Sequence, residues 1–227
     1  MNTEEKVIEE ANKYFERNKN AITDVNEASK NAYLANDFIR KYITSYPGTI
    51  KSILEVGCNY GYNLNFLSKQ LGVECWGIDP SDKAIEYGNA RWKNVNKKVH
   101  LAQGISNRLP YNDSEFDVVM VGFLMYVTPR EMISDTVLEV NRVLKAGGFL
   151  ILTDFDTPIN YKRSNKHNSG MPVYKEDYAK RFLPMGYSII EKNSYSHSGD
   201  CFNPDVQERV STQVLYKEEF ENLYLKA

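Results

Sequence analysis

Apolar residues in the first 45 positions recur every three or four residues, which is the period of an amphipathic helix. Val7, Ala11 and Phe15 share one face of a predicted helix over residues 3–18, and a second helix is predicted over about 28–45. The turn-forming sequence YPG follows and ends the second helix. Both helices precede the rest of the fold, and we expect them to cap one edge of a pocket.

From residue 51 onward, short apolar runs alternate with segments of helical period. Gly72 ends the first of these helices, Ser81 caps the second, and Pro129 opens the third, which closes on two glycines. This alternation is typical of a doubly wound parallel sheet. Strands are predicted at 51–57, 73–79, 98–104, 115–124 and 148–155, and helices at 62–72, 81–95 and 129–148.

The last third of the chain has a different pattern. Residues 158–172 are polar and rich in turn formers, which predicts a loop over an edge of the sheet. Residues 174–186 have helical periodicity up to Pro184, whereas 187–196 and 207–218 alternate like strands. Two strands with only one helix before them predict a closing antiparallel pair.

Together these patterns predict an α/β fold, a Rossmann-like doubly wound sheet of about seven mostly parallel strands with an antiparallel last strand. Helices are expected on both faces of the sheet. We divide the chain into an N-terminal helical cap over 1–48, a Rossmann-like domain over 49–217 and a C-terminal tail over 218–227.

The sequence ILEVGCNYG, which ends the first strand, suggests a ligand site. Gly57 and Gly61 allow the backbone to turn sharply and approach a ligand, at the edge of the sheet where such folds bind ligands. Asp79 ends the second strand 22 residues after Gly57, where a carboxylate can accept both hydroxyls of a ribose. These features indicate a ligand that contains a nucleoside. Two glycines four residues apart after a strand also occur without a ligand, and this alternative stays open.

A dinucleotide is the rival ligand. The fingerprint GxGxxG needs glycine at positions 59 and 62, where this chain has Asn59 and Tyr62. The turn therefore departs from the sequence typical of a pyrophosphate-binding site.

Four motifs in order resemble those of class I S-adenosylmethionine-dependent methyltransferases, in the small-molecule, type 11-like branch. They are ILEVGCNYG, GIDPSDKAIEYG, LPYNDSEFDVVMVGFLMYV and EVNRVLKAGGFLILTDF, and they span residues 51 to 155. The resemblance implies S-adenosylmethionine as cofactor and S-adenosylhomocysteine as product. In the family, the acid at Glu55 and the glycines line the methionine half of the cofactor, and the acid at Asp79 holds the ribose. The cofactor-binding positions that the resemblance implies are Glu55, Gly57, Cys58, Asn59, Gly61, Asp79, Pro80, Ile105, Ser106 and Phe123.

The chain departs from the family pattern at two of these positions. Asn59 replaces a central glycine, so it is expected to crowd the turn. Ile105 stands where the family often has an acid that accepts the adenine amino group. Adenine recognition would then depend on backbone groups near Ile105 and Ser106 and on apolar packing.

Methyl transfer from a sulfonium is an in-line displacement that needs orientation and a dry pocket, and a general base helps when the acceptor is a hydroxyl. His167, His197 and Tyr126 are the candidate catalytic residues, because each follows a predicted strand on the substrate side. The alternatives are solvated loop histidines and a tyrosine that fills a half-buried edge. His100, inside a strand, is interpreted as structural.

Asp154 and Asp156 leave the fifth strand toward the pocket. They can orient a hydroxyl or bind a metal, or they can cap the strand end as turn-forming acids. These readings stay open, and no metal ligand is assigned.

Composition narrows the choice of partners. The 227 residues carry a net charge of −2 with no polybasic run, which argues against nucleic acid. No apolar stretch approaches the roughly 20 residues of a membrane span. The three scattered cysteines and the acidic first segment indicate a reduced, cytoplasmic protein. We expect a small-molecule acceptor and a monomer or homodimer.

The predicted function is methyl transfer to a small molecule. PINYKRS and QERVSTQVLYK weakly resemble methylases of bacterial surface-sugar pathways, which favours a hydroxyl of a sugar, nucleotide sugar or glycan precursor. The alternatives are a quinone-type ring carbon, a nitrogen acceptor and a catalytically silent nucleoside-binding relative. A nicotinamide dehydrogenase is disfavoured by the missing glycines.

Overall fold

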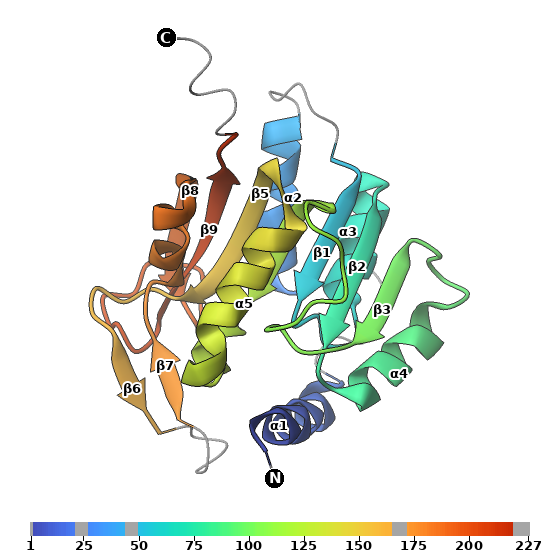
Figure 1. The fold of residues 1–227 in the computed structure, drawn as a ribbon, viewed down its shortest axis with the longest axis horizontal. Coiled ribbons are helices and arrows are strands. Elements are labelled where there is room, and N and C mark those ends of the chain that lie inside the picture. Colours follow the sequence, from blue (N-terminus) through green and yellow to red (C-terminus); the bar gives the residue numbers. More distant parts are fainter. Residues whose placement is uncertain (1, 21–26, 44–49, 165–171, 220–227) are drawn as a thin grey trace.

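A seven-stranded sheet forms the centre of the protein in the computed structural model, which describes residues 2–20, 27–43, 50–164 and 172–219 (Figure 1). The strand order is β3-β2-β1-β4-β5-β9-β8, and the first five strands in this order are parallel to one another. β9 pairs antiparallel with both β5 and β8, so the predicted antiparallel last strand is confirmed. The strands are β1 Ser52–Val56, β2 Glu74–Asp79, β3 Val99–Gln103, β4 Phe116–Gly122, β5 Leu144–Phe155, β8 Tyr187–Ser196 and β9 Arg209–Lys217.

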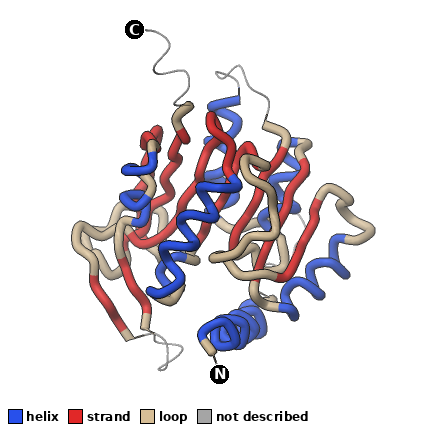
Figure 2. The backbone as a smooth tube through the Cα atoms, viewed as in Figure 1, coloured by secondary structure: helices blue, strands red, loops and turns tan. Residues whose placement is uncertain are grey.

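Helices cover both faces of the sheet, as predicted (Figure 2). Apolar side chains of α5 pack on one face, and those of α2 and α3 pack on the other. α1 lies across the end of the sheet to which β1 and β2 point (Figure 1). The helices are α1 Thr3–Asn18, α2 Lys30–Ile43, α3 Tyr62–Leu71, α4 Asp82–Trp92 and α5 Arg130–Val143.

At most of the helix ends, the structure agrees with the start and stop signals in the sequence. Gly72 ends α3 in a left-handed conformation, and the Ser81 hydroxyl accepts a hydrogen bond from the amide of Ala84 at the start of α4. α5 begins after Pro129 but stops at Val143, short of the predicted pair of glycines. Its last apolar residues continue directly into β5, which is longer at its start than predicted.

The segment before β8 differs from the prediction of a loop followed by a helix. β6, Tyr161–Arg163, pairs antiparallel with β7, Val173–Lys175. Residues 165–171 of the predicted loop lie outside the described residues. Two short 3₁₀ turns, Tyr178–Arg181 and Leu183–Met185, replace the predicted helix. The proline at position 184 has no amide hydrogen to donate and disfavours a continuous α-helix there.

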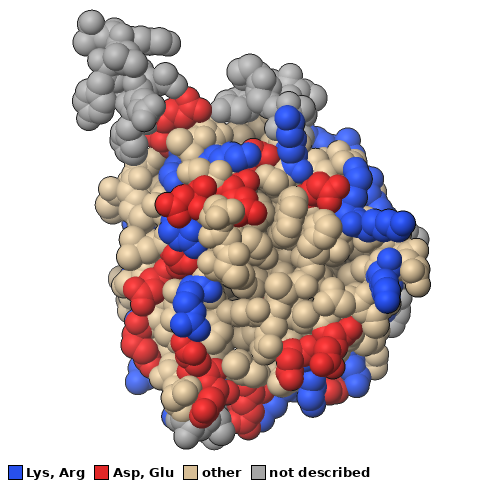
Figure 3. Space-filling view, turned by 45° about the vertical axis from the view of Figure 1, so that its right-hand side comes forward, with Lys and Arg blue, Asp and Glu red and all other residues tan. Residues whose placement is uncertain are grey.

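Charges of both signs are intermixed over the face drawn in Figure 3. In the part of the chain that the structure describes, no helix is long and apolar enough to cross a membrane.

The turn after β1 packs closely against α4. The indole nitrogen of Trp92 donates a hydrogen bond to the carbonyl oxygen of Tyr60 at 2.6 Å. A Cβ atom placed on Gly88 would lie 2.6 Å from the same oxygen. Gly88 therefore allows the helix to approach the turn that follows β1.

We predict that Gly88→Ala destabilises the protein by about 1–3 kcal/mol, because the added methyl group meets backbone. Helix propensity alone would favour alanine by about 1 kcal/mol, so the sign of the change is informative. Denaturant unfolding measures it, with Glu86→Ala as an exposed control on the same helix. A stabilised Gly88→Ala variant would contradict the close packing.

Candidate functional site

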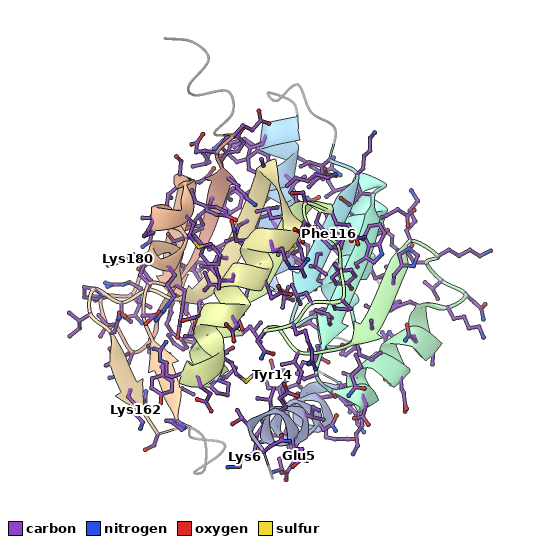
Figure 4. All side chains as sticks on the ribbon, in the orientation of Figure 1. Glu5, Lys6, Tyr14, Phe116, Lys162 and Lys180 are labelled. Carbon is purple, nitrogen blue, oxygen red and sulfur yellow. The ribbon has the colours of Figure 1, made fainter. Side chains whose placement is uncertain are left out.

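A cavity of about 960 Å³ opens at the ends of β1, β2 and β4. Pockets for small molecules and cofactors typically measure roughly 300–1,000 Å³, so this one has room for two ligands side by side. α1, the start of α2 and the loop after β8 form its roof. Tyr14 extends from α1 toward the end of the sheet (Figure 4).

The turn after β1 forms the floor of the cavity. Gly57 and Asn59 both have left-handed backbone conformations, with φ of 83° and 51°. Asparagine tolerates this conformation better than most residues with a side chain. Asn59 therefore takes the backbone conformation that a glycine would adopt, and its side chain becomes part of the cavity wall.

Gly61 has a structural position rather than one on the cavity. It precedes α3 with φ of 74°, and a Cβ atom there would lie 2.7 Å from Cδ2 of Leu101. It is absent from the residues that line the cavity, unlike Gly57, Cys58 and Asn59.

Asp79 lies at the centre of the floor, where β2 ends. Its Oδ2 accepts a hydrogen bond from the amide of Asn59 at 2.8 Å, and its Oδ1 accepts one from the amide of Ser81 at 2.9 Å. The side chain is buried, and burial raises its pKa to about 6 although the two amides oppose the shift. The carboxylate keeps further lone pairs that can accept ligand hydroxyls.

Glu55 lies in the same wall, at the end of β1. Its Oε1 accepts a hydrogen bond from Nδ2 of Asn63 at 2.7 Å, whereas Oε2 is buried without a partner among the described residues. Burial raises the pKa of Glu55 to about 8, and the charge of Asp79 adds to the shift. Oδ1 of Asn59 is also buried without a partner. Buried polar atoms without partners are unfavourable by about 1–3 kcal/mol each, so this wall favours a ligand with polar groups that pair with them.

Ile105 and Ser106, after β3, line the cavity beside Pro80. The amide of Gly104 donates to the carbonyl oxygen of Asp79 at 3.0 Å, which fixes this segment against β2. The Ser106 hydroxyl shares a hydrogen bond of 2.9 Å with that of Thr136 and is turned toward α5. Polar contacts from this segment to a ligand would therefore come from its backbone.

The opposite half of the cavity is aromatic. Phe123 follows β4 in a left-handed conformation, φ 50°, and its ring meets that of His197 edge-on at 5.4 Å. His197 also stacks on Phe155, with 5.9 Å between ring centroids and planes 10° apart. Tyr195 also lines this half, whereas Tyr14 and Tyr62 line the part of the cavity near Asp79 and Glu55.

Two of the three predicted catalytic residues reach this half. Tyr126 and His197 both line the cavity, Tyr126 partly buried and His197 exposed at the mouth. Burial, followed by the charge of Asp154, raises the pKa of Tyr126. His167 lies outside the described residues. His100 lies on β3, where its ring pairs with Glu74 at 2.9 Å, away from the cavity.

Asp154 and Asp156 hold the end of β5 rather than line the cavity. Asp154 accepts hydrogen bonds from the amides of Tyr126 and Phe155, and Asp156 accepts one from Lys192 at 2.8 Å. This arrangement corresponds to the capping alternative. Within the described ranges, no group of three or more His, Cys, Asp or Glu side chains is arranged to hold a metal ion.

Sequence reasoning missed the side chains of the roof. Lys30 donates to Oδ1 of Asp200 at 2.5 Å, and its ammonium lies 3.8 Å from the ring centroid of Tyr195. These contacts join α2 to the loop that carries His197. Polar residues scattered over two amphipathic helices carry no local signal that they face a ligand. The missed residues are Tyr14, Arg17, Ser29, Lys30, Asn31 and Asn63.

The fold and the floor of the cavity define a class: a Rossmann-like domain with a turn and a carboxylate placed for a nucleoside. Residues 53–148 match the family model of the methyltransferase domain. The demethylmenaquinone methyltransferase of Staphylococcus haemolyticus is 32% identical over 145 residues, which cover 62% of this chain and 55% of that relative. The chain spans little more than half the length of the curated relatives it matches.

Two solved structures share the fold. An S-adenosylmethionine-dependent methyltransferase of Methanosarcina mazei aligns with a TM-score of 0.60 and 20% identity, over 78% of this chain and 96% of that one. The 1,6-didemethyltoxoflavin N1-methyltransferase of Burkholderia thailandensis, with S-adenosylhomocysteine bound, aligns with a TM-score of 0.61 and 12% identity, over 87% and 94%. The matched part of the chain, residues 53–148, is a methyltransferase domain of the class I fold, as its motifs predicted, and S-adenosylmethionine is the cofactor of that class.

The buried acids predict how stability depends on pH. Burial raises the pKa values of Glu55, Asp79 and Asp154 to about 8, 6 and 7. A raised carboxyl pKa stabilises the fold below its unfolded-state value near 4, and this contribution is lost as the pH rises through the folded-state value. The melting temperature of the ligand-free protein is therefore expected to fall between pH 5 and pH 8.

Glu55→Gln removes one of these groups and should make that fall smaller. Glu86→Gln changes an exposed acid of α4 and should leave the slope as in the wild type. A melting temperature that rises from pH 5 to pH 8 would contradict the burial of these acids.

Proposed function

We propose that this protein transfers a methyl group from S-adenosylmethionine to a small molecule whose flat ring enters the aromatic half of the cavity. The observation that carries the proposal is the division of one cavity into two chemical halves. Glu55, Asp79 and the buried polar atoms without partners lie at one end, and the clustered rings of Phe123, Tyr126 and His197 lie at the other.

The first half suits the cofactor. Asp79 is placed to accept the ribose hydroxyls, and Pro80, Ile105 and Ser106 offer an apolar wall with backbone groups to the adenine. Gly57 lines the cavity beside Glu55, where the amino-acid arm would lie along the backbone of the turn. When bound, the cofactor supplies an electrophilic methyl group on a sulfonium, and the protein supplies orientation and exclusion of water.

The second half suits the acceptor. Phe123 and Tyr126 present rings that can stack on a flat molecule or face a sulfonium through cation–π attraction. We assign His197 as the general base, because its imidazole lies at the mouth between these rings and the solvent. His167 stays a predicted catalytic residue.

A ring acceptor agrees with the polar groups around this half, which are largely paired with one another. The Tyr195 hydroxyl bonds Thr212 at 3.0 Å, and the Ser196 hydroxyl bonds that of Ser198 at 3.2 Å. The similar Staphylococcus haemolyticus protein is named a demethylmenaquinone methyltransferase, which also supports a quinone-type ring. A hydroxyl of a sugar or nucleotide sugar is the second candidate, favoured by the polar side chain of Asn31 on the cavity lining.

The test begins with calorimetric titration of S-adenosylmethionine and S-adenosylhomocysteine, followed by turnover on matched panels of quinols and sugars. Binding with methylation of a ring compound supports the proposal. Methylation of sugars alone would contradict the ring acceptor and support a sugar hydroxyl as the acceptor. Binding without turnover on either panel would favour a catalytically silent relative, and preference for NAD would contradict the cofactor.

Asp79→Ala should weaken cofactor binding by roughly 1–3 kcal/mol, or about 5- to 150-fold, through the lost hydrogen bonds to a partly buried ribose. Calorimetry measures the change. Asp82→Ala, an exposed acid three residues further along, is the control and should bind as the wild type does. Unchanged cofactor affinity in Asp79→Ala would contradict the proposed contact between Asp79 and the ribose.

His197→Phe and His197→Ala separate two roles of the same ring. Phenylalanine keeps the stack on Phe155 but cannot take a proton, so kcat should fall about 100-fold or more while the acceptor KM stays near the wild-type value. Alanine should lower kcat and also raise KM. His100→Phe is the surface control. Full activity in His197→Phe would exclude this residue as the base.

A further inference from the structure

Asn63, the second residue of α3, connects the roof of the cavity to Glu55. It is buried, with 5% of its surface exposed. Its Oδ1 accepts two hydrogen bonds from Ser29, from the amide at 3.0 Å and from the hydroxyl at 2.8 Å. Its Nδ2 donates to Oε1 of Glu55 at 2.7 Å.

Ser29 determines which way the Asn63 amide faces. An asparagine carries an acceptor on one side and a donor on the other, and Ser29 offers its amide hydrogen to the acceptor side. The NH₂ group must then face Glu55. In this orientation Asn63 donates a hydrogen bond to Oε1 of Glu55, and Oε2 of Glu55 is left without a partner.

Among the described residues, no positively charged side chain contributes to the electrostatics of that carboxyl. The ionisable groups that act on it or feel its charge are Asp79 and Cys75 of β2, Cys58 of the turn and Tyr62 of α3. All four groups are neutral when protonated and negative when deprotonated. A cationic group on a ligand would therefore supply the positive charge that these neighbours lack.

We infer that Asn63, held by Ser29, is a positioning residue that directs the free oxygen of Glu55 toward the cationic amino group of the bound nucleoside's amino-acid arm. The inference rests on the proposed function, because that function places the arm beside Glu55. It also makes the start of α2 part of the cofactor site. Ser29 immediately precedes Lys30, the first residue of α2, whose contact with Asp200 closes the roof.

Ligand binding at this carboxyl should release a proton. Burial raises the pKa of Glu55 to about 8, so the empty site holds a protonated carboxyl at pH 7. When the ammonium group arrives, the carboxyl O–H bond breaks, the proton leaves to solvent, and the carboxylate pairs with the ammonium. The hydrogen bond from Asn63 assists this step because it favours the charged form.

Two ligands separate this role from a general effect on the fold. S-adenosylhomocysteine carries the amino-acid arm, whereas 5′-methylthioadenosine keeps the nucleoside and the sulfur but lacks the arm. Asn63→Ala should weaken S-adenosylhomocysteine about 10-fold through the misplaced carboxyl and leave 5′-methylthioadenosine within about twofold. Asn65→Ala, a buried asparagine of the same helix that bonds Asn96, is the matched control and should change neither.

Three further variants test the order of the contacts. Ser29→Ala should give a smaller loss than Asn63→Ala, because the backbone amide bond to Asn63 remains, and Ser29→Thr should restore wild-type affinity. In a double-mutant cycle, Asn63→Ala should have little effect once Glu55 is Gln. Calorimetry in two buffers at pH 7 should show a proton released by the wild type on binding S-adenosylhomocysteine and none by Glu55→Gln.

Equal weakening of both ligands by Asn63→Ala, additive effects in the cycle, or no proton release by the wild type would each overturn the inference while the methyltransferase proposal stands. If the wild-type protein binds neither nucleoside, the proposed function fails and the inference fails with it.

Discussion

The cavity at the ends of the strands depends on one connection between β1 and β2. The amides of Gly57 and Cys58 donate to the carbonyl oxygen of Ile78, and the amide of Asn59 donates to the carboxylate of Asp79. These bonds fasten the turn after β1 to the end of β2. They position the carboxylate, expose the backbone and direct the chain into α3. Without them, the floor of the cavity and the closely packed α4 would lose their common support.

The floor and the sheet were predictable because their physical requirements are local. A buried parallel strand must be apolar over several residues, and a sharp turn at its end needs conformations that glycine or asparagine adopt. Gly57 and Asp79 show these requirements in the sequence, whereas Asn59, which was expected to crowd the turn, takes the backbone conformation of a glycine. The antiparallel pairing of the last two strands also followed from their alternation.

The roof and the small β6–β7 pair were not predictable in the same way. Lys30 contacts Asp200, which lies 170 residues away in the chain, and Ser29 contacts Asn63 through side chains that have many other possible partners. Such contacts follow from tertiary packing and not from periodicity. The predicted helix over 174–186 did not form: its first residues lie in β7, which pairs with β6, and two short 3₁₀ turns follow.

The position of α1 in the chain has a consequence for synthesis on the ribosome. Phe15, its one buried residue, packs on Tyr60 and Tyr87, which are made 45 and 72 residues later. At about 5–20 residues per second, the helix waits on the order of ten seconds for its partners. Its own sequence supports it meanwhile: Asn2 and Glu5 form a capping box, and Lys13 pairs with two glutamates of the preceding turn. α1, one part of the roof of the cavity, is thus translated before the residues it packs on and completes these contacts only after Tyr87 has been made.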